Sequence, residues 1–118
     1  MGTDYQHRVA YFRPLLERML NEVLALRDAS KQSREAVQLD QQSVGRLSRM
    51  DAIQVQQMAL AADRSRQVQI ARIRRALGQT EAGDYGFCLT CGEEIPDGRL
   101  RADPTAHLCV ICASARAD

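Results

Sequence analysis

Residues 85–112 read YGFCLTCGEEIPDGRLRADPTAHLCVIC and contain all four cysteines of the 118-residue chain. Cys88 and Cys91 form one Cys-x-x-Cys pair, Cys109 and Cys112 form a second, and 17 residues separate the pairs. This spacing is typical of a four-cysteine zinc site. Tetrahedral Zn²⁺ takes thiolates at about 2.3 Å, and each Cys-x-x-Cys turn brings two sulfur atoms to one side of a tight loop.

The residues beside the two pairs predict a treble-clef-like finger. Gly92 follows the first pair, where a tight turn favours a residue that tolerates positive φ. The second pair runs into residues 113–116, so we expect Cys109 and Cys112 at the start of a short helix. Four thiolates close the coordination shell, so the zinc would be structural and not catalytic. His107 is an alternative ligand, but with four thiols present we expect it on the loop surface.

Two other uses of the cysteines are alternatives to zinc binding. Disulfide bonds are disfavoured because the sequence shows no signal peptide, and a cytoplasmic protein keeps its thiols reduced. A redox Cys-x-x-Cys motif normally occurs once, beside a βαβ pattern that this sequence lacks. Zinc is the favoured interpretation, and a thiol switch that releases zinc on oxidation stays open as an alternative.

The composition favours long helices and gives little support to nucleic-acid binding. Charged residues make up 26% of the chain and aromatic residues 4%, with no Trp. The formal net charge is +1 and would become −1 with one Zn²⁺ on four thiolates. A protein that grips phosphates is normally basic, so a zinc-ribbon nucleic-acid binder is the weaker alternative. No apolar run is long enough to cross a membrane, and we expect a cytoplasmic protein.

Before the finger, an apolar seam predicts a first long helix. Its spacing alternates between three and four residues, which is a coiled-coil signal. The seam comprises Val9, Phe12, Leu16, Met19, Val23, Leu26, Ser30, Ser33 and Val37. Proline fits best in the first turn of a helix, so Pro14 predicts a main helix from about Arg13. We expect residues 4–12 to form a separate or kinked turn and residues 1–7 to be loosely held.

A turn and a second helix are expected next. The polar cluster around Gly45 predicts a turn within residues 39–50. A second helix is predicted over residues 51–79, with Gly78 and Gly83 ending it. Its apolar residues are Ile53, Val55, Met58, Leu60, Val68, Ile70, Ile73 and Leu77. Each helix would form a rod of roughly 40 Å.

These patterns predict a mainly α fold. We expect an antiparallel two-helix coiled-coil hairpin joined to a small four-cysteine treble-clef-like zinc finger with a short C-terminal helix. The predicted division places the N-terminal segment and hairpin in residues 1–80, with the tip at about 39–50. The finger and the C-terminal helix occupy residues 81–118. A hairpin of this length would carry its tip far from the finger.

The finger resembles the DksA/TraR family of zinc-finger transcription factors. The motifs that carry the resemblance are Tyr85-Gly86-Phe87-Cys88, Cys91-Gly92-Glu93-Glu94-Ile95-Pro96, Arg99-Leu100, Pro104-Thr105-Ala106, Leu108-Cys109 and Cys112. The resemblance is close over residues 83–113. For the hairpin before them, the resemblance is in architecture. It implies a non-enzymatic bacterial regulator that binds RNA polymerase and not DNA. The resemblance also implies that the hairpin enters the secondary channel, where its tip affects initiation.

The predicted tip departs from the family pattern. Well-known members carry Asp-x-x-Asp-x-Ala there, whereas this chain reads SRMDAI from Ser48. Ser48 stands in for the first Asp, Asp51 matches the second, and Ala52 comes one position early. Counting back from the cysteines instead aligns the motif with Gly45 and Ser48. Ser48 and Asp51 also fit a capping box at the start of the second helix, so a cap and a polymerase contact both stay open.

Arginines on the second helix predict a basic face. Arg64, Arg72 and Arg75 fall within about 80° on a helical wheel, and residues 64–75 contain no acid. A solvated surface and an electrostatic contact with an acidic polymerase surface are both open interpretations. The family resemblance further implies that some members bind ppGpp through basic groups. Two of those positions are Asp103 and Ala113 here and Arg72 matches a third, which predicts weak ppGpp dependence.

Overall fold

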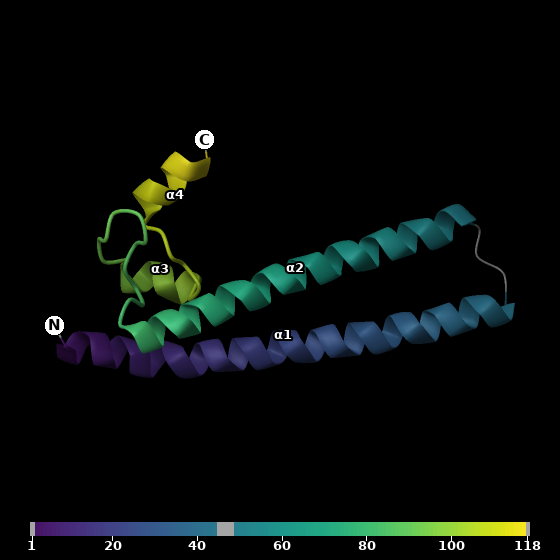
Figure 1. Ribbon diagram of the computed structural model, residues 1–118, viewed down its shortest axis with the longest axis horizontal. Helices are drawn as coiled ribbons and strands as arrows, with labels where there is room; N and C mark the ends of the chain where they lie inside the picture. Colours follow the sequence, from purple (N-terminus) through teal and green to yellow (C-terminus); the bar gives the residue numbers. More distant parts are fainter. Residues whose placement is uncertain (1, 45–48, 118) are drawn as a thin grey trace. The chain divides into compact units, whose positions relative to one another are not determined.

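The computed structural model describes the backbone of residues 2–44 and 49–117, and the side chains of residues 4–32 and 49–115. Over these ranges the chain forms helices α1 (Gly2–Val44), α2 (Arg49–Ala82), α3 (Asp97–Ala102) and α4 (Val110–Ala117), shown in Figure 1. The extended pairing within them is one isolated antiparallel bridge between Phe87 and Glu94. The predicted mainly α class is confirmed.

The contacts divide the chain into two compact units. The first unit combines Met1–Leu20 with Arg72–Asp118, and the second is Asn21–Ala71. The first unit therefore holds the start of α1, the end of α2 and the whole cysteine region. The predicted division at residues 80 and 81 stays a prediction.

Helix α1 runs through Pro14, which corrects the expected helix start near Arg13. Proline removes one backbone N–H donor and disfavours a helix interior. However, Phe12 and Leu16 on either side are 2% and 0% exposed, while Pro14 itself faces solvent. Burial of these two side chains, at about 1.5–3 kcal/mol each, offsets the lost hydrogen bond. The expected separate turn over residues 4–12 was therefore wrong, and residues 2–7, which were expected to be loosely held, belong to α1.

Helix α2 ends later than the sequence indicated. Gly78 lies inside the helix, and Thr80 beyond it is buried with its hydroxyl donating to the Leu77 carbonyl at 2.6 Å. The helix stops where Gly83 adopts a φ of +85°, a left-handed conformation that costs glycine little. The Asp84 amide then donates to the Gln79 carbonyl at 3.0 Å, the bond of a Schellman cap. Gly83 ends the helix and Gly78 does not.

The core of the first unit is centred on Tyr85. Its side chain is fully buried, and its ring lies 5.7 Å from that of Phe12 between centroids. The Tyr85 hydroxyl donates to the Pro104 carbonyl at 2.8 Å, which satisfies the buried phenol. The other buried apolar side chains of this unit are Leu16, Ile73, Ala76, Cys88, Ile95, Leu100, Ala106 and Leu108. The ends of both long helices and the finger therefore share one core.

The second unit, by contrast, has a thin seam. The half-buried positions of α2 in this unit are Ala52, Ala59, Ala62, Asp63 and Arg66. Asp63 and Arg66 pair at 3.5 Å, and Ile70 is the large apolar side chain of α2 that is buried there. Leu26, expected in the seam of the first helix, is 58% exposed. The predicted seam was therefore wrong at Leu26.

Candidate metal centre

The first cysteine pair lies on a tight loop after Tyr85. The loop closes through bonds from the Cys88 amide to the Glu93 carbonyl at 2.8 Å and from the Ile95 amide to the Gly86 carbonyl at 2.7 Å. At its turn the Gly92 amide donates to the Cys88 carbonyl at 2.9 Å, and Gly92 has a φ of +76°. The predicted need for glycine at this position is confirmed.

The second cysteine pair lies at the start of α4, as predicted. The Cys112 amide donates to the Cys109 sulfur at 3.4 Å, and the Ala113 amide donates to the Cys109 carbonyl at 2.9 Å. The Leu89 amide donates to the His107 carbonyl at 2.9 Å, and this bond ties the two knuckles together.

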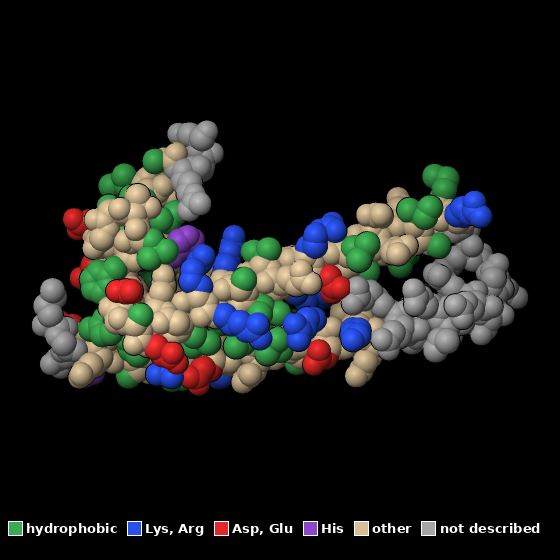
Figure 2. Space-filling model, in the orientation of Figure 1, with side chains coloured by type: hydrophobic (Ala, Val, Ile, Leu, Met, Phe, Trp, Pro, Cys, Tyr) green, Lys and Arg blue, Asp and Glu red, His purple; other side chains and the backbone are tan. Residues whose placement is uncertain are grey.

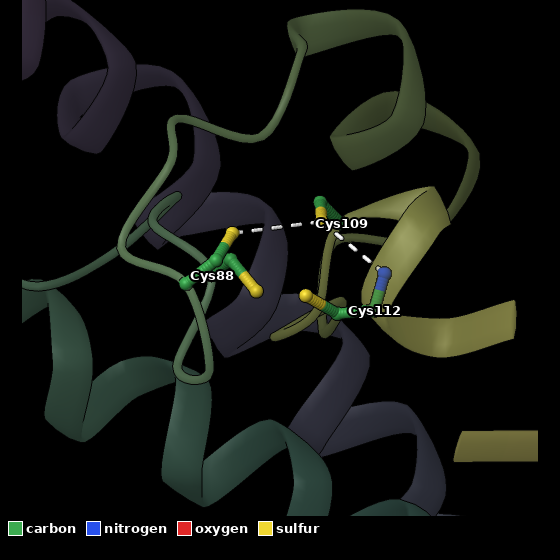
Figure 3. Close-up of side chains that lie close together, drawn as sticks. Cys88, Cys109 and Cys112 are labelled. Carbon is green, nitrogen blue, oxygen red and sulfur yellow. Dashed lines mark hydrogen bonds between the residues drawn. The ribbon is translucent and has the colours of Figure 1, made fainter. Parts of the chain in front are cut away.

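The two knuckles bring all four sulfur atoms into one cluster. The Sγ atoms of Cys88, Cys91, Cys109 and Cys112 lie within 4.8 Å of one another, and none is in a disulfide. Figure 3 shows Cys88, Cys109 and Cys112 close together. The Cys91 and Cys109 sulfurs are 3.7 Å apart. Zn–S bonds of about 2.3 Å in a tetrahedron require S···S edges of about 3.8 Å, so the cluster fits zinc.

The acidity of the thiols also favours a cation at their centre. The Cys91 amide is the main cause that lowers the pKa of Cys88 to about 6. The neighbouring Cys109 thiol is the main cause that raises the pKa of Cys112 to about 12. Four thiolates this close repel one another strongly, so they can all ionise near neutral pH only when a metal ion compensates their charge.

Polar contacts outside the cluster hold the loop between the cysteine pairs. Arg75 donates to Nδ1 of His107 at 2.9 Å, and the Arg99 Nε donates to the Leu108 carbonyl at 3.0 Å. Because Arg75 can only donate, Nδ1 of His107 carries no proton in this contact. Asp103 accepts bonds from the Thr105 amide at 3.1 Å and hydroxyl at 2.7 Å. These side chains position the second cysteine pair.

The first turns of α1 also support the metal centre, which the sequence analysis missed. Arg8 is only 10% exposed, and its Nη2 lies 2.9 Å from Glu94 and 2.8 Å from Asp97. Its Nη1 donates to the Gly86 carbonyl at 3.2 Å. The Tyr5 hydroxyl accepts a bond from the Tyr85 amide at 3.3 Å. Residues 5, 8 and 12 recur at helical spacing, and this recurrence was the sequence signal that could have placed them on one face of the helix.

The remaining predicted site residues belong to α2 or directly precede it in the sequence. Ser48 lies outside the described residues. Asp51 is exposed in the first turn of α2, and Ala52 beside it is half-buried. Arg72 and Arg75 are exposed in the first unit and Arg64 is exposed in the second. Among the helices the structure describes, none is long and apolar enough to span a membrane.

Comparison with known sequences points to one family. Residues 83–116 match the family model described as the prokaryotic dksA/traR C4-type zinc finger. The chain is 33% identical over 117 residues to the RNA polymerase-binding transcription factor DksA of Escherichia coli. That match covers 94% of this chain and 74% of the relative. DksA of Haemophilus influenzae is 44% identical over 50 residues, which cover 42% of this chain and 34% of that protein.

Solved structures share the fold. Transcription factor DksA2 from Pseudomonas aeruginosa has a TM-score of 0.70 at 27% identity, covering 91% of this chain and 81% of that one. The transcriptional regulator Dks from Chlamydia trachomatis has a TM-score of 0.56 at 22% identity and covers 92% of this chain and 86% of that one. With the cysteine cluster, these likenesses confirm the predicted combination of a coiled-coil hairpin and a four-cysteine zinc finger.

Proposed function

Because this chain belongs to the DksA/TraR family of four-cysteine zinc-finger proteins, we propose that it is a bacterial transcription regulator that binds RNA polymerase and modulates initiation. The observation that carries the proposal is the 33% identity with an RNA polymerase-binding transcription factor over 94% of the chain. That match extends through the long helices as well as the finger. The hairpin therefore belongs to the shared functional unit.

The hairpin tip is the part that acts on the polymerase. We place Ser48, Asp51 and Ala52 in the secondary channel, close to the polymerase active site. The exposure of Asp51 at the start of α2 supports this role, since its carboxylate is accessible to a partner. The same position in the first turn favours the helix electrostatically, so Asp51 can serve as a cap and a contact together.

The finger fixes the base of the hairpin through one structural zinc ion. Cys88, Cys91, Cys109 and Cys112 would hold the ion, and its contribution is to cross-link the two knuckles. Four protein ligands leave no open coordination position for a substrate, which supports a non-enzymatic role. Arg8 and Tyr5 extend this support to α1 through the contacts described above.

Basic residues on α2 supply electrostatic contacts with the polymerase. Arg64 and Arg72 are exposed and suit an acidic surface. Arg75 contributes less to this contact because its guanidinium also bonds His107. Weak ppGpp dependence is proposed as well. Asp103, at one of the family's basic positions, is engaged by Thr105 and brings negative charge where a phosphate would need a cation.

Binding and transcription measured together test this proposal. Purified core RNA polymerase is titrated with the zinc-loaded protein, and transcription from a ribosomal promoter is measured with the wild type and with Asp51→Asn. We expect Asp51→Asn to bind like the wild type and to lose its effect on initiation. Asp28→Asn is the matched control, because Asp28 is an exposed carboxylate on α1 whose partner Arg27 is 3.9 Å away. It should bind and act normally.

The outcomes separate the two roles of Asp51. If Asp51→Asn acts as strongly as the wild type and only lowers the stability of the hairpin, by about 0.3–1 kcal/mol, Asp51 is a helix cap alone. The tip contact must then be assigned to another residue. Failure of the wild-type protein to bind polymerase would contradict the proposed function itself.

A further inference from the structure

The first unit contains a cavity between residues 4–12 of α1 and residues 94–101, which we name the α1–α3 cavity. Its volume is about 400 Å³, within the range of about 300–1,000 Å³ that is typical of small-molecule sites. Figure 2 shows acidic and basic side chains close together on the visible face of this unit, so charge alone does not mark a site. The α1–α3 cavity differs because its charged side chains enclose a hollow.

Helical periodicity brings the side chains of the cavity together. In α1, positions 4, 7, 8 and 11 fall within an arc of about 100° at 100° per residue. In α3, Asp97 and Arg101 lie one turn apart, which places their Cβ atoms about 5–6 Å from each other. Arg8, which is 10% exposed, joins the two sides, since its Nη2 lies 2.8 Å from Asp97 and 2.9 Å from Glu94. A nearly buried ion-pair cluster therefore fixes the shape of the cavity.

The cavity offers charges of both signs beyond this ion-pair cluster. Asp4 and Arg101 are exposed, and among the side chains that the structure describes neither forms an ion pair. Glu94 and Asp97 are 64% and 57% exposed, so each carboxylate has lone pairs for further donors. With His7 neutral, three carboxylates and two guanidiniums give the lining a net charge of −1. The cavity therefore suits a cationic ligand that also carries an anionic group.

A basic α-amino acid carries this combination of charges. Its α-ammonium and carboxylate groups are attached to one carbon, which suits Asp97 and Arg101 on adjacent turns of α3. Asp4 precedes Arg8 by one turn, about 6 Å along α1, and the four-carbon stem of lysine is long enough to span a distance of this size. Tyr11, which lines the cavity and is 58% exposed, gives the stem an apolar surface.

We propose that the α1–α3 cavity binds a free basic α-amino acid of the lysine type. Asp97 accepts from the α-ammonium group, Arg101 donates to the carboxylate, and Asp4 accepts from the side-chain ammonium group. The site shares no residue with the cysteine cluster or with the hairpin tip, and it does not depend on the proposed function. Because the ligand contacts both α1 and α3, its binding stabilises the first unit.

An NMR titration of the full-length, zinc-loaded, isotope-labelled protein with L-lysine tests the site. We expect saturable changes in chemical shift confined to residues 4–12 and 94–101. Cadaverine, which is lysine without its carboxylate, should bind at least about tenfold more weakly. L-Leucine, which lacks the side-chain ammonium group, should also bind at least about tenfold more weakly. L-Lysine should raise the melting temperature of the protein in proportion to its saturation of the site.

Two variants assign the contacts. Arg101→Gln should weaken the binding of L-lysine at least about tenfold and should not weaken the binding of cadaverine, which has no carboxylate. Asp4→Asn should lower the affinity for L-lysine toward that for L-leucine. Arg74→Gln is the matched control, because Arg74 is an exposed arginine of the same unit that does not line the cavity. It should bind L-lysine within about twofold of the wild type. All three positions are exposed, and urea unfolding checks that each variant is folded.

Three results would overturn the proposal. Chemical-shift changes that do not saturate, or that spread over acidic residues of the whole surface, would show nonspecific attraction of a cation. Equal affinity for L-lysine and cadaverine would exclude recognition of an amino acid. A loss of affinity in Arg74→Gln as large as that in Arg101→Gln would show that overall charge governs binding. Polymerase binding is measured separately, so the proposed function stands or fails independently of these results.

Discussion

The guanidinium of Arg8 lies 2.8 Å from the carboxylate of Asp97, and this contact joins the first turns of α1 to the start of α3. The same guanidinium contacts Glu94 and the Gly86 carbonyl. Arg8 thus links the first helix to both sides of the loop that carries Cys88. The finger and the start of α1 therefore form one structural unit, and several consequences can be measured.

Arg8→Gln should destabilise the first unit. The substitution removes a nearly buried guanidinium with three acceptors, although Glu94 and Asp97 are more than half exposed and regain water. We expect a loss of about 1–2 kcal/mol in the free energy of unfolding. Urea denaturation of the zinc-loaded protein measures it. Arg13→Gln, which breaks exposed pairs with Glu17 and Glu81, is the control and should cost less than about 0.5 kcal/mol.

Gly86→Ala should lower the free energy of unfolding more than alanine at Gly83 or Gly98 does. Gly86 has a φ of +86°, and an added Cβ would collide with the Arg8 guanidinium. We expect a loss of about 2–3 kcal/mol by thermal or urea unfolding. Gly83→Ala keeps the unfavourable φ with open space around it and should cost about 1 kcal/mol. Gly98→Ala, in α3 with open space, should be neutral or slightly stabilising. Equal losses at Gly83 and Gly86 would contradict the collision.

Tyr85 should limit stability at alkaline pH. Burial is the main cause that raises the pKa of its hydroxyl well above the ordinary value near 10. Because the pKa of Tyr85 is higher in the folded state than in the unfolded state, the neutral buried phenol contributes its full stability below about pH 10. That contribution is lost as the pH rises further, because the unfolded state then releases the proton first. Tyr85→Phe loses the bond to Pro104, about 1 kcal/mol, but has no phenol to ionise. The difference in melting temperature between wild type and Tyr85→Phe should shrink between pH 9 and pH 11.

An exposed tyrosine provides the control for this titration. Tyr11 is 58% exposed, and Tyr11→Phe is measured over the same pH range as the reference variant. If the difference between the wild type and Tyr85→Phe does not shrink from pH 9 to pH 11, burial of the Tyr85 phenol does not govern the loss of stability at alkaline pH.

Zinc should bind in a ratio of one per chain and stabilise the fold. Cys112→Ala removes one of the four clustered ligands and should reduce the zinc content well below one, as measured by mass spectrometry of metals. A strong chelator should lower the melting temperature of the wild type by at least about 10 °C, because structural zinc contributes directly to folding. His107→Ala should keep its zinc, since four thiols suffice. Loss of zinc in that variant would make His107 a ligand.

The sequence predicted the metal cluster and the fold class well, because both follow from local rules. The spacing of the Cys-x-x-Cys pairs and the positive φ at Gly92 are properties of short segments. The interruption at Pro14 was predicted wrongly because burial of Phe12 and Leu16, a tertiary effect, overrides helix propensity. Arg8 was missed because seam analysis considers apolar residues, and a buried cation is recognised only once its partners are placed.

The face of α2 that is buried could not be predicted from the periodicity of its apolar residues. Several apolar residues of this helix face solvent, while alanines and the Asp63–Arg66 pair are half-buried. Two apolar rows on one helix cannot be told apart from the sequence when either could face α1. Only the placement of α2 in its unit shows that apolar residues such as Leu60 and Val68 face solvent.

Site-specific crosslinking from the tip tests the central claim most directly. A photoreactive amino acid replaces Met50, which is 80% exposed and adjacent to Asp51, in the zinc-loaded protein bound to RNA polymerase. The crosslinked peptides are then identified by mass spectrometry. We predict crosslinks to polymerase peptides that line the secondary channel near the active site. Crosslinks confined to the outer surface of the polymerase, with binding intact, would contradict insertion of the tip.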